Sequence, residues 1–494
     1  LVLTLQATAS SESSSRPPNI IFILADDLGW ADVSFRGDPQ IPTPNLDVLA
    51  SQGIILDNYY VQHLCTPSRG ALMSGLYPIH TGLQHFVPGP AEPWGLSPNF
   101  TILPEYLRDL AYSNHMIGKW HLGYHKESYT PTRRGFDSFY GFYNGGEDYY
   151  SHEMLLADDA GLDFWAGTTP VRNETGHYST NLFTSKAVSL IRKHDESKPL
   201  FLYLSHQAVH CADYKNKLQA PASAIAHFPY IISLNRSIYA GAVYELDQSV
   251  GLVMEALHKR RMLKNSIVIF STDNGGLPWG SDANSGYNWP LRGSKSTLWE
   301  GGIRGPAFVW SPLLSKMGRL SNQMMHITDW LPTLYSAAGG NVSTLGDIDG
   351  KDMWDALSED LPSPRREILV NIDPLLNNSA LIDGRRKIVL GTAHEGRFDR
   401  REKAPGGTRP EEGLDHMMFA SRTGMVLKEF YGVSRLAVRT NWRNETVVNC
   451  RKHAPRDNFE VASPPYYFDL EKDPCELDNL AASNETVSSD LEGI

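Results

Sequence analysis

Two pairs of oxygen-bearing side chains follow apolar runs of the sequence. Asp26 and Asp27 come after the first long apolar run, and Asp273 and Asn274 come after a later one. Adjacent carboxylates at the end of a buried strand are unfavourable unless a cation or hydrogen-bond donors satisfy them. For one pair alone, a helix cap or surface turn is an equal alternative. Two such strand ends together favour a hard divalent ion, Ca²⁺ or Mg²⁺.

Cys65 lies at the start of another candidate chemical segment. Residues Ser68–Ser74 predict the start of a helix, with Pro67 at an early position and Ser68 able to cap it. A cysteine at a helix N-terminus would have a lowered pKa and lie beside an anion-binding site. This favours a reactive thiol, with a buried structural cysteine as an equal alternative.

Three continuous apolar runs predict the strands that position these residues. They are Asn19–Ala25, Leu200–Leu204 and Ser266–Phe270, each typical of a strand buried on both faces. Helical patterns lie between them, at Asn45–Gln52, Leu103–Leu110, Asn181–Arg192 and Ser237–Arg260. This alternation predicts an α/β fold with a mostly parallel sheet flanked by helices. The active site is expected at the carboxyl ends of the strands.

The pattern changes after about Gly350. Short strand-like runs appear there, at Glu367–Ile372, Lys387–Leu390, Leu436–Arg439 and Tyr466–Leu470. They predict a smaller C-terminal α+β domain with an antiparallel sheet. The expected division is a catalytic domain at residues 17–360 and a C-terminal domain at residues 361–494.

Composition excludes some classes of function. The 494 residues include 45 Lys and Arg and 56 Asp and Glu, so the formal net charge is −11. This balance argues against a nucleic-acid-binding protein. No apolar run after the N-terminus approaches the ~20 residues that cross a bilayer, so no membrane insertion is expected. The sequence carries no signal for an oligomeric state.

The N-terminal segment and the sequons indicate the secretory pathway. Residues Leu1–Ala9 resemble the end of a signal peptide, with Ala7-Thr8-Ala9 as a cleavage pattern; an N-terminal tail is the alternative. Seven Asn-x-Ser/Thr sequons are spread along the chain, at Asn99, Asn173, Asn235, Asn341, Asn377, Asn444 and Asn484. A secreted or lysosomal protein is therefore expected.

Several segments together resemble a known family. Residues 65–69, Cys65-Thr66-Pro67-Ser68-Arg69, resemble the sulfatase signature C-x-P-S-R, and residues 118–123 (GKWHLG) resemble the second family signature. The metal pair at residues 273–274 and the run at residues 288–302 complete the pattern. The chain thus resembles the type I sulfatases, and within them arylsulfatase B and its invertebrate relatives. The resemblance implies an alkaline-phosphatase-like core.

The resemblance implies a nucleophile and a metal. In sulfatases the signature cysteine, here Cys65, becomes formylglycine through the formylglycine-generating enzyme. One oxygen of the hydrated aldehyde attacks sulfur, and collapse of the resulting sulfate ester releases sulfate, which splits the displacement into two steps. The family's metal is Ca²⁺, held by the modified Cys65 together with Asp26, Asp27, Asp273 and Asn274.

The resemblance also implies roles for cationic side chains. Lys119, Lys295 and His210 would contact the sulfate oxygens, and Lys295 or His210 would protonate the leaving oxygen. Arg69 would orient the diol, and His121 would take its proton. The family usually has proline shortly after the histidine at position 210.

The segment after His210 departs from the family pattern. Here His210 precedes Cys211-Ala212-Asp213, and His206 could substitute for it. The changed loop Cys211–Pro221 borders the expected substrate mouth. It therefore leaves the inherited substrate specificity in doubt.

The predicted function is hydrolysis of an organic sulfate ester to an alcohol and inorganic sulfate. The substrate would be an aryl, sugar or small dietary sulfate such as a glucosinolate. One alternative is an arylsulfatase B-type N-acetylgalactosamine-4-sulfatase acting on glycosaminoglycans. The others are a phosphoesterase on the same fold and a non-catalytic sulfatase-fold binding protein.

Four cysteines and two basic runs complete the candidates. Cys450 and Cys475 could form a disulfide that closes a loop of about 25 residues, which would leave Cys211 as a thiol. The runs Arg385–Lys387 and Arg397–Lys403 could contact a sulfated polysaccharide. Solvated loops are the favoured alternative for both runs.

Overall fold

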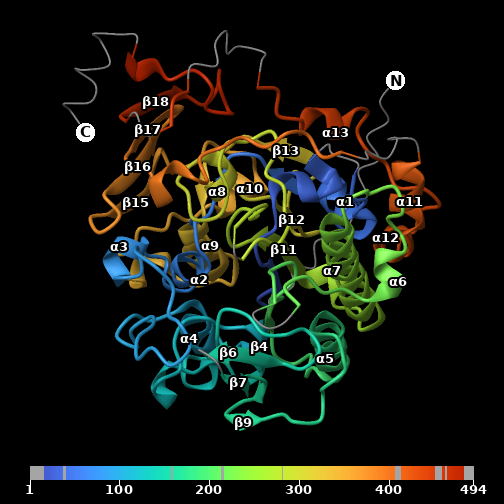
Figure 1. Ribbon diagram of the computed structural model, residues 1–494. Helices are drawn as coiled ribbons and strands as arrows, with labels where there is room; N and C mark the ends of the chain where they lie inside the picture. Colours follow the sequence, from blue (N-terminus) through green and yellow to red (C-terminus); the bar gives the residue numbers. More distant parts are fainter. Residues whose placement is uncertain are drawn as a thin grey trace.

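The computed structural model describes residues 16–36, 40–156, 159–212, 216–280, 282–406, 413–450, 459–461 and 464–482. The predicted signal-peptide remnant at residues 1–9 and the sequon at Asn484 lie outside these residues. Figure 1 shows one large sheet with helices around it and a smaller sheet beside it.

Five parallel strands form the centre of a ten-stranded sheet. Their order is β11 (Ser266–Thr272), β1 (Asn19–Ala25), β10 (Leu200–Ser205), β4 (Ser113–Lys119) and β5 (Ser138–Phe142). Every residue of β1 is buried, because both faces of this strand are covered. The three predicted apolar strands are confirmed, and they lie side by side.

Shorter strands extend the sheet at both edges. Beyond β11 come β12 (Ala307–Trp310) and β2 (Ile54–Leu56), each antiparallel to its inner neighbour, and then β13 (Arg319–Ser321), parallel to β2. Beyond β5 come antiparallel β8 (Trp165–Ala166) and β9 (Thr169–Pro170). Two small sheets pair β14 (Met325–His326) with β3 (Tyr59–Tyr60), and β6 (Glu153–Leu156) with β7 (Asp159–Leu162).

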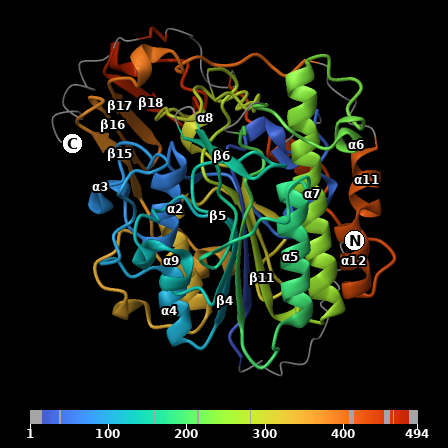
Figure 2. The ribbon, with the colours of Figure 1, turned by 60° about the horizontal axis from the view of Figure 1, so that its bottom comes forward.

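Helices cover both faces of the large sheet, as Figure 2 shows. One face packs against α1 (Pro44–Gln52), α5 (Ser179–Lys193) and the long α7 (Leu234–Lys259). The opposite face packs against α2 (Cys65–Ser74), α4 (Leu103–Asp109), α9 (Trp330–Ala337) and α10 (Trp354–Ser358). The predicted α/β architecture is therefore confirmed, and the four helices predicted from sequence are present. The short helices are α3 (Pro78–Thr81), α6 (Ala222–Ile225) and α8 (Glu300–Ile303).

The C-terminal part contains a four-stranded antiparallel sheet. Its order is β15 (Glu367–Asp373), β16 (Asn378–Asp383), β17 (Arg386–Leu390) and β18 (Tyr466–Asp469). Three of these strands are predicted from sequence, whereas β16 is not. The prediction of a strand at residues 436–439 is wrong. Leu436 there is buried against the helical face of the large sheet, and the described residues offer that segment no strand partner.

Three C-terminal helices, which the sequence pattern did not reveal, follow a long connection. They are α11 (Leu414–Ala420), α12 (Arg422–Tyr431) and α13 (Trp442–Glu445). Helix α12 packs against α7 and α1, so C-terminal residues complete a layer of the large sheet. The expected domain division at residue 360 stays a prediction.

A buried ion cluster joins the four-stranded C-terminal sheet to α8. The Nζ of Lys387 on β17 lies 3.0 Å from a carboxylate oxygen of Glu300 on α8 and 2.7 Å from one of Glu476. All three side chains are buried. Glu476 follows Cys475, which forms a disulfide with Cys450. Of the run Arg385–Lys387, Lys387 therefore points inward, and Arg385 pairs with Asp469 and Glu471. Binding of an anionic polymer by this run stays a prediction.

Among the described residues, no helix combines the length and apolar character needed to cross a bilayer.

Candidate active site

The predicted site residues meet at the carboxyl ends of the parallel strands. Asp26 and Asp27 follow β1, Asp273 and Asn274 follow β11, and Lys119 ends β4. Because these strands are neighbours with the same direction, their ends lie at one edge of the sheet. Helix α2 packs on the same face and brings Cys65 and Arg69 to this edge. All seven side chains are buried.

Carboxylates and cations alternate in the centre of the site. The Nζ of Lys119 donates a hydrogen bond of 2.6 Å to Asp26, and the Nζ of Lys295 donates one of 2.7 Å to Asp27. Arg69 donates to Asp273 through Nε at 3.0 Å and through Nη2 at 2.7 Å. Such charge-assisted bonds in a buried space fix the side chains in position.

Ser68 links the Cys65 segment to the metal pair, which differs from its predicted role. Helix α2 begins at Cys65, so Ser68 lies inside the first turn and is no N-cap. Its hydroxyl accepts a hydrogen bond from the backbone N–H of Gln62 and donates to the carbonyl of Asp273. The signature serine therefore holds strand β11 against helix α2.

The thiol of Cys65 faces the two carboxylates after β1. Its Sγ lies 3.5 Å from Oδ1 of Asp26 and 3.9 Å from Oδ1 of Asp27. Burial raises the pKa of this thiol and outweighs the lysine charges nearby. The interpretation of Cys65 as a thiolate activated by the helix N-terminus is therefore wrong for the unmodified side chain.

The charges of the site shift the ionisation of its carboxyl groups. Burial and the negative charge of Asp273 raise the pKa of Asp26 to about 8. Burial opposes the ionisation of Asp273 too, but Arg69 and the two lysines lower its pKa. Three carboxyl groups thus compete for the same cations, which is an arrangement that a further cation would stabilise.

The same side chains fit a metal ion. One ligand atom from each of Asp26, Asp27, Cys65 and His210 lies within 4.8 Å of the others. Asn274 donates to Asp27 at 2.7 Å through Nδ2. Its Oδ1 is buried and has no hydrogen-bond partner among the described residues. An unpaired amide oxygen beside carboxylates is a donor set suited to a hard divalent cation.

His121 lies on the chain two residues after Lys119. Its Nε2 lies 3.3 Å from the carbonyl of Pro88, and its Nδ1 is buried with no partner among the described residues. Burial and the charge of Lys119 hold the pKa of His121 well below its usual range, so the imidazole is neutral. A Cβ at Gly145 would lie 2.8 Å from the ring, so glycine leaves the space that the ring occupies.

His210 and His206 have different surroundings. His210 Nε2 lies 3.6 Å from Oδ2 of Asp27, so this histidine belongs to the cluster. His206 is buried among helices, and its Nε2 lies 3.0 Å from the hydroxyl of Ser249. The structure thus brings His210, rather than His206, to the site.

Two backbone features at the site depart from ordinary geometry. Asp27 and His121 have φ values of 57° and 53°, in the left-handed region that residues other than glycine adopt uncommonly, although Asn, Asp and His do so more often than the rest. Strain of this kind persists where the surroundings hold the backbone, often at functional sites. Here Asn284 donates to the carbonyl of Asp27 at 2.8 Å.

Asn284 and Ser205 are site residues that sequence reasoning missed. Ser205, the last residue of β10, donates to the carbonyl of Lys119 at 2.9 Å and accepts from Arg69. Neither residue lies in a family signature, although Ser205 directly precedes His206, the alternative considered for His210. For Ser205, the available signal was its place at the end of an apolar run that predicts a strand. For Asn284, the sequence offered no such signal.

The fold and the site define an α/β protein with a buried carboxylate and cation centre at the carboxyl edge of its sheet. The family model described as Sulfatase matches residues 18–340. The chain belongs to the sulfatase family.

Named relatives support the same assignment. Arylsulfatase J of Mus musculus is 46% identical over 360 residues, which is 72% of this chain and 58% of that protein. N-acetylgalactosamine-6-sulfatase of Mus musculus is 32% identical over 369 residues, with 72% and 69% of the two chains covered. The match to arylsulfatase J therefore spans less than two thirds of that relative.

A solved structure agrees over almost the whole chain. The crystal structure of Ps i-CgsB in complex with k-i-k-neocarrahexaose has a TM-score of 0.73 and 26% identity. It covers 96% of this chain and 91% of that chain.

Proposed function

We propose that this protein hydrolyses organic sulfate esters to an alcohol and inorganic sulfate, with Cys65 converted to formylglycine. The observation that carries the proposal is the position of Cys65, whose Sγ lies 3.5 Å from Asp26 and is exposed to the charges of Lys119 and Lys295. Membership of the sulfatase family supports it, as do relatives named arylsulfatase and N-acetylgalactosamine-6-sulfatase.

The surrounding residues would bind and orient the sulfate group. The aldehyde hydrate that replaces the Cys65 thiol supplies the nucleophilic oxygen. Lys119, Lys295 and His210 present cationic or hydrogen-bonding nitrogens to the sulfate oxygens and stabilise the charge that develops there. Lys295 or His210 gives a proton to the leaving oxygen.

His121 fits the role of the base, and Arg69 fits that of an orienting residue. A neutral imidazole with one buried, unpartnered nitrogen can accept a proton from the hydrate. Arg69 is held by Asp273 and Ser205, so its guanidinium has little freedom to move. A rigid cation in this place keeps the nucleophilic oxygen in line with sulfur.

The metal of this site is proposed to be Ca²⁺, held by Asp26, Asp27, Asp273, Asn274 and the modified Cys65. Bound there, a divalent cation would neutralise carboxylates and polarise sulfate oxygens.

Asn274→Ala should weaken calcium binding, because it removes the buried Oδ1 that lacks a protein partner. Calcium at 100 times its Kd stabilises a protein by about 2.7 kcal/mol. We expect the calcium-dependent rise in melting temperature to shift to at least ~10-fold higher calcium in the variant. Bound calcium measured by elemental analysis should fall in parallel.

Asn322→Ala is the matched control, since Asn322 is an exposed asparagine outside the site. An Asn274→Ala protein that keeps the wild-type calcium titration would refute the assignment of this ligand. Stabilisation by Mg²⁺ but not by Ca²⁺ would refute the identity of the ion.

The activity itself is tested on the wild-type chain. After production together with a formylglycine-generating enzyme, mass spectrometry of the Cys65 peptide should show the aldehyde. Aryl sulfates should then be hydrolysed much faster than the matching aryl phosphates. Preference for phosphate would favour the phosphoesterase alternative, and an unmodified Cys65 in native material would favour the non-catalytic binding protein.

The physiological substrate is proposed to be an aryl, sugar or small dietary sulfate. N-acetylgalactosamine 4-sulfate in glycosaminoglycans is the second candidate, supported by a relative named for the 6-sulfate of that sugar. A structural neighbour in complex with a neocarrahexaose supports a saccharide. A panel of these esters, compared by kcat/KM, distinguishes them.

We also propose that the protein enters the secretory pathway, as a secreted or lysosomal enzyme. The disulfide between Cys450 and Cys475 supports an oxidising compartment. All six described sequon asparagines are exposed to solvent, as glycosylation requires: Asn99, Asn173, Asn235, Asn341, Asn377 and Asn444.

A further inference from the structure

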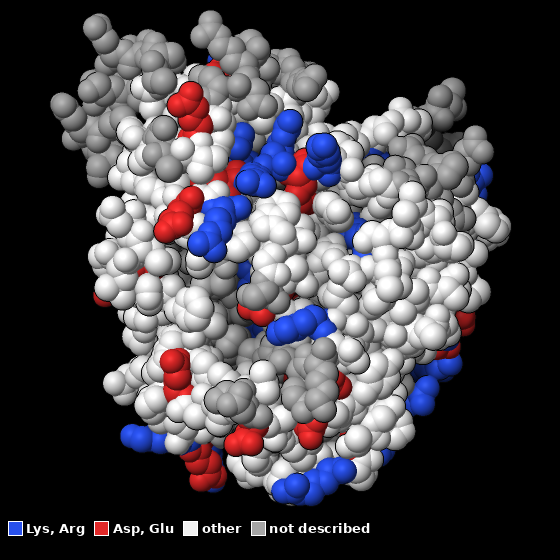
Figure 3. Space-filling model, in the orientation of Figure 1, with Lys and Arg blue, Asp and Glu red and all other residues white. Residues whose placement is uncertain are grey.

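A pocket of about 420 Å³ lies outside the catalytic cluster. It is close in the chain to residues 292–295, which we call the Lys295 turn. We name it the basic pocket, and its lining is Pro278, Trp279, Tyr287, Arg397, Arg400, Arg401, Glu402, Lys403 and Ala404. It therefore combines one segment next to the site, residues 278–287, with one from the C-terminal part. Figure 3 shows several Lys and Arg side chains on the upper half of the face that it draws, with some acidic side chains among them.

The C-terminal wall of the basic pocket is paired with the Lys295 turn. Residues Arg292 and Arg401 form an antiparallel bridge, and the N–H of Gly293 donates to the carbonyl of Arg400 at 3.0 Å. Lys295 follows Arg292 by three residues, which span at most about 11 Å of chain. The pocket thus lies within reach of a unit neighbouring the one that carries the reacting sulfate.

The other wall is anchored to the same turn. The N–H of Lys295 donates to the carbonyl of Gly276 at 3.1 Å, and Asn288 accepts from the N–H of Gly276 at 2.8 Å. Trp279 follows three residues later. Its Nε1 is buried and has no partner among the described residues, although the ring lines the pocket. An indole ring that lines a pocket can stack on a sugar.

The charge of the basic pocket is strongly positive. Arg400 and Lys403 are exposed, Arg401 is half-buried, and none of the three forms an ion pair with a described carboxylate. Glu402 is the one acidic lining residue; it accepts from the N–H of Asn288, and burial raises its pKa well above the usual range. The cations are therefore not neutralised within the pocket.

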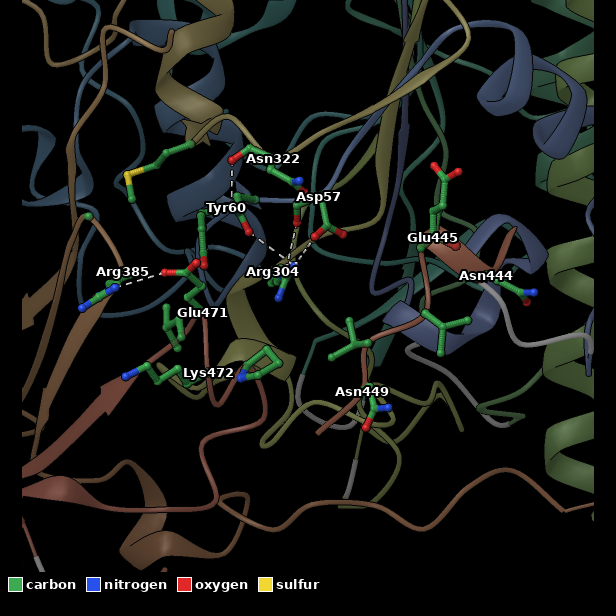
Figure 4. Close-up of a pocket in the computed structure, with 18 residues that line it drawn as sticks. Asp57, Tyr60, Arg304, Asn322, Arg385, Asn444, Glu445, Asn449, Glu471 and Lys472 are labelled. Atoms are coloured by element: carbon green, nitrogen blue, oxygen red, sulfur yellow. Dashed lines mark hydrogen bonds and ion pairs between the residues drawn. The ribbon is translucent and has the colours of Figure 1, made fainter. Parts of the chain in front are cut away.

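A larger cavity elsewhere makes a useful contrast. It measures about 870 Å³ and lies between the four-stranded C-terminal sheet and the segment of β2 and β3 (Figure 4). Two of its cations are paired with lining carboxylates, Arg304 with Asp57 and Arg385 with Glu471, whereas Lys472 has no ion pair with a described carboxylate. Among the described residues, the basic pocket therefore has three cations without an ion pair, Arg400, Arg401 and Lys403, and the larger cavity has one.

We propose that the basic pocket binds a second anionic group, a sulfate or carboxylate, on a saccharide whose neighbouring unit carries the ester under hydrolysis. This inference rests on the proposed sulfatase activity and extends it to the class of substrate. It assigns Arg400 and Arg401 as specificity-determining residues, and Trp279 as the platform for the sugar ring. A small ester with one sulfate would not reach this pocket.

The test compares two substrates in wild-type and Arg400→Gln/Arg401→Gln proteins. The substrates are an aryl sulfate with one charge and a sulfated oligosaccharide with several. The ratio of kcat/KM for the oligosaccharide to that for the aryl sulfate should fall about tenfold in the variant. The replaced side chains leave the backbone pairing of residues 400–401 with residues 292–293 intact.

Arg385→Gln/Lys472→Gln, which removes the same charge from the larger cavity, should leave the ratio unchanged. An unchanged ratio in the Arg400→Gln/Arg401→Gln protein, or an equal fall in the control protein, would overturn the proposal. Binding is measured separately, by calorimetry of the Cys65→Ser protein with the oligosaccharide and with inorganic sulfate. If the wild type hydrolyses no sulfate ester, the proposed function fails, while weaker oligosaccharide binding after loss of Arg400 and Arg401 still supports the pocket. If the protein binds inorganic sulfate but not the oligosaccharide, the proposal for the basic pocket is overturned.

Discussion

Replacing Cys65 with Ala is expected to lower kcat for sulfate ester hydrolysis by at least ~10³-fold. The alanine cannot be converted to an aldehyde, so the covalent route is lost and only binding and charge stabilisation remain. The buried cations around residue 65 should still bind sulfate. Asp26, Asp27 and Asp273, rather than residue 65, hold these cations in position. KM, or the Kd for sulfate, should therefore change much less than kcat.

Folding should survive this change. The Cys65 side chain is small, and its thiol interacts only weakly with Asp26 and Asp27. Circular dichroism and melting temperature, measured with and without calcium, should stay close to wild type. Cys211→Ala is the matched control, since Cys211 is the other buried cysteine outside the disulfide. Activity retained in Cys65→Ala would refute the role of Cys65, and equal loss in Cys211→Ala would remove its specificity.

Replacing Lys387 with Met is expected to destabilise the protein by about 3–5 kcal/mol. Lys387 is fully buried and neutralises Glu300 on α8 and Glu476 in the C-terminal segment. Without this ammonium, the two carboxylates repel each other in a space that excludes water. Tyr60 donates to Glu300 at 3.1 Å, but a neutral hydroxyl cannot replace the lost charge.

Arg386→Met provides the control on the same strand. Arg386 is half-buried, and its guanidinium donates to the hydroxyl of Tyr467 at 2.9 Å. Its loss should cost less than about 1 kcal/mol. Urea unfolding followed by tryptophan fluorescence measures both variants. Equal stability of the Lys387→Met and Arg386→Met proteins would show that the buried ion cluster does not hold the C-terminal sheet against α8.

The sequence by itself predicted the centre of the fold and the contents of the site. The strands at residues 19–25, 200–204 and 266–270 were predictable because burial on both faces requires an unbroken apolar run. The chemical residues could be named because Cys65, Lys119 and their neighbours lie in short segments that resemble family signatures. These are properties of residues close together along the chain.

Other features depend on contacts between distant segments, and only the tertiary structure decided them. Ser68 looks like a helix cap in sequence, but it bonds to Asp273, which is 205 residues away. Lys387 stands in a run of three basic residues, yet alternation along β17 turns it inward to Glu300.

Arg400 and Arg401 read as a solvated loop until their pairing with residues 292–293 places them beside the Lys295 turn. Helix α12 was missed for a related reason, since its apolar face is short and is completed only by α7 and α1. Local periodicity and motifs report which residues prefer burial or do chemistry. Which residue pairs with each charge depends on the order of the strands and on packing between distant segments. Neighbouring residues in the sequence carry no direct signal of either.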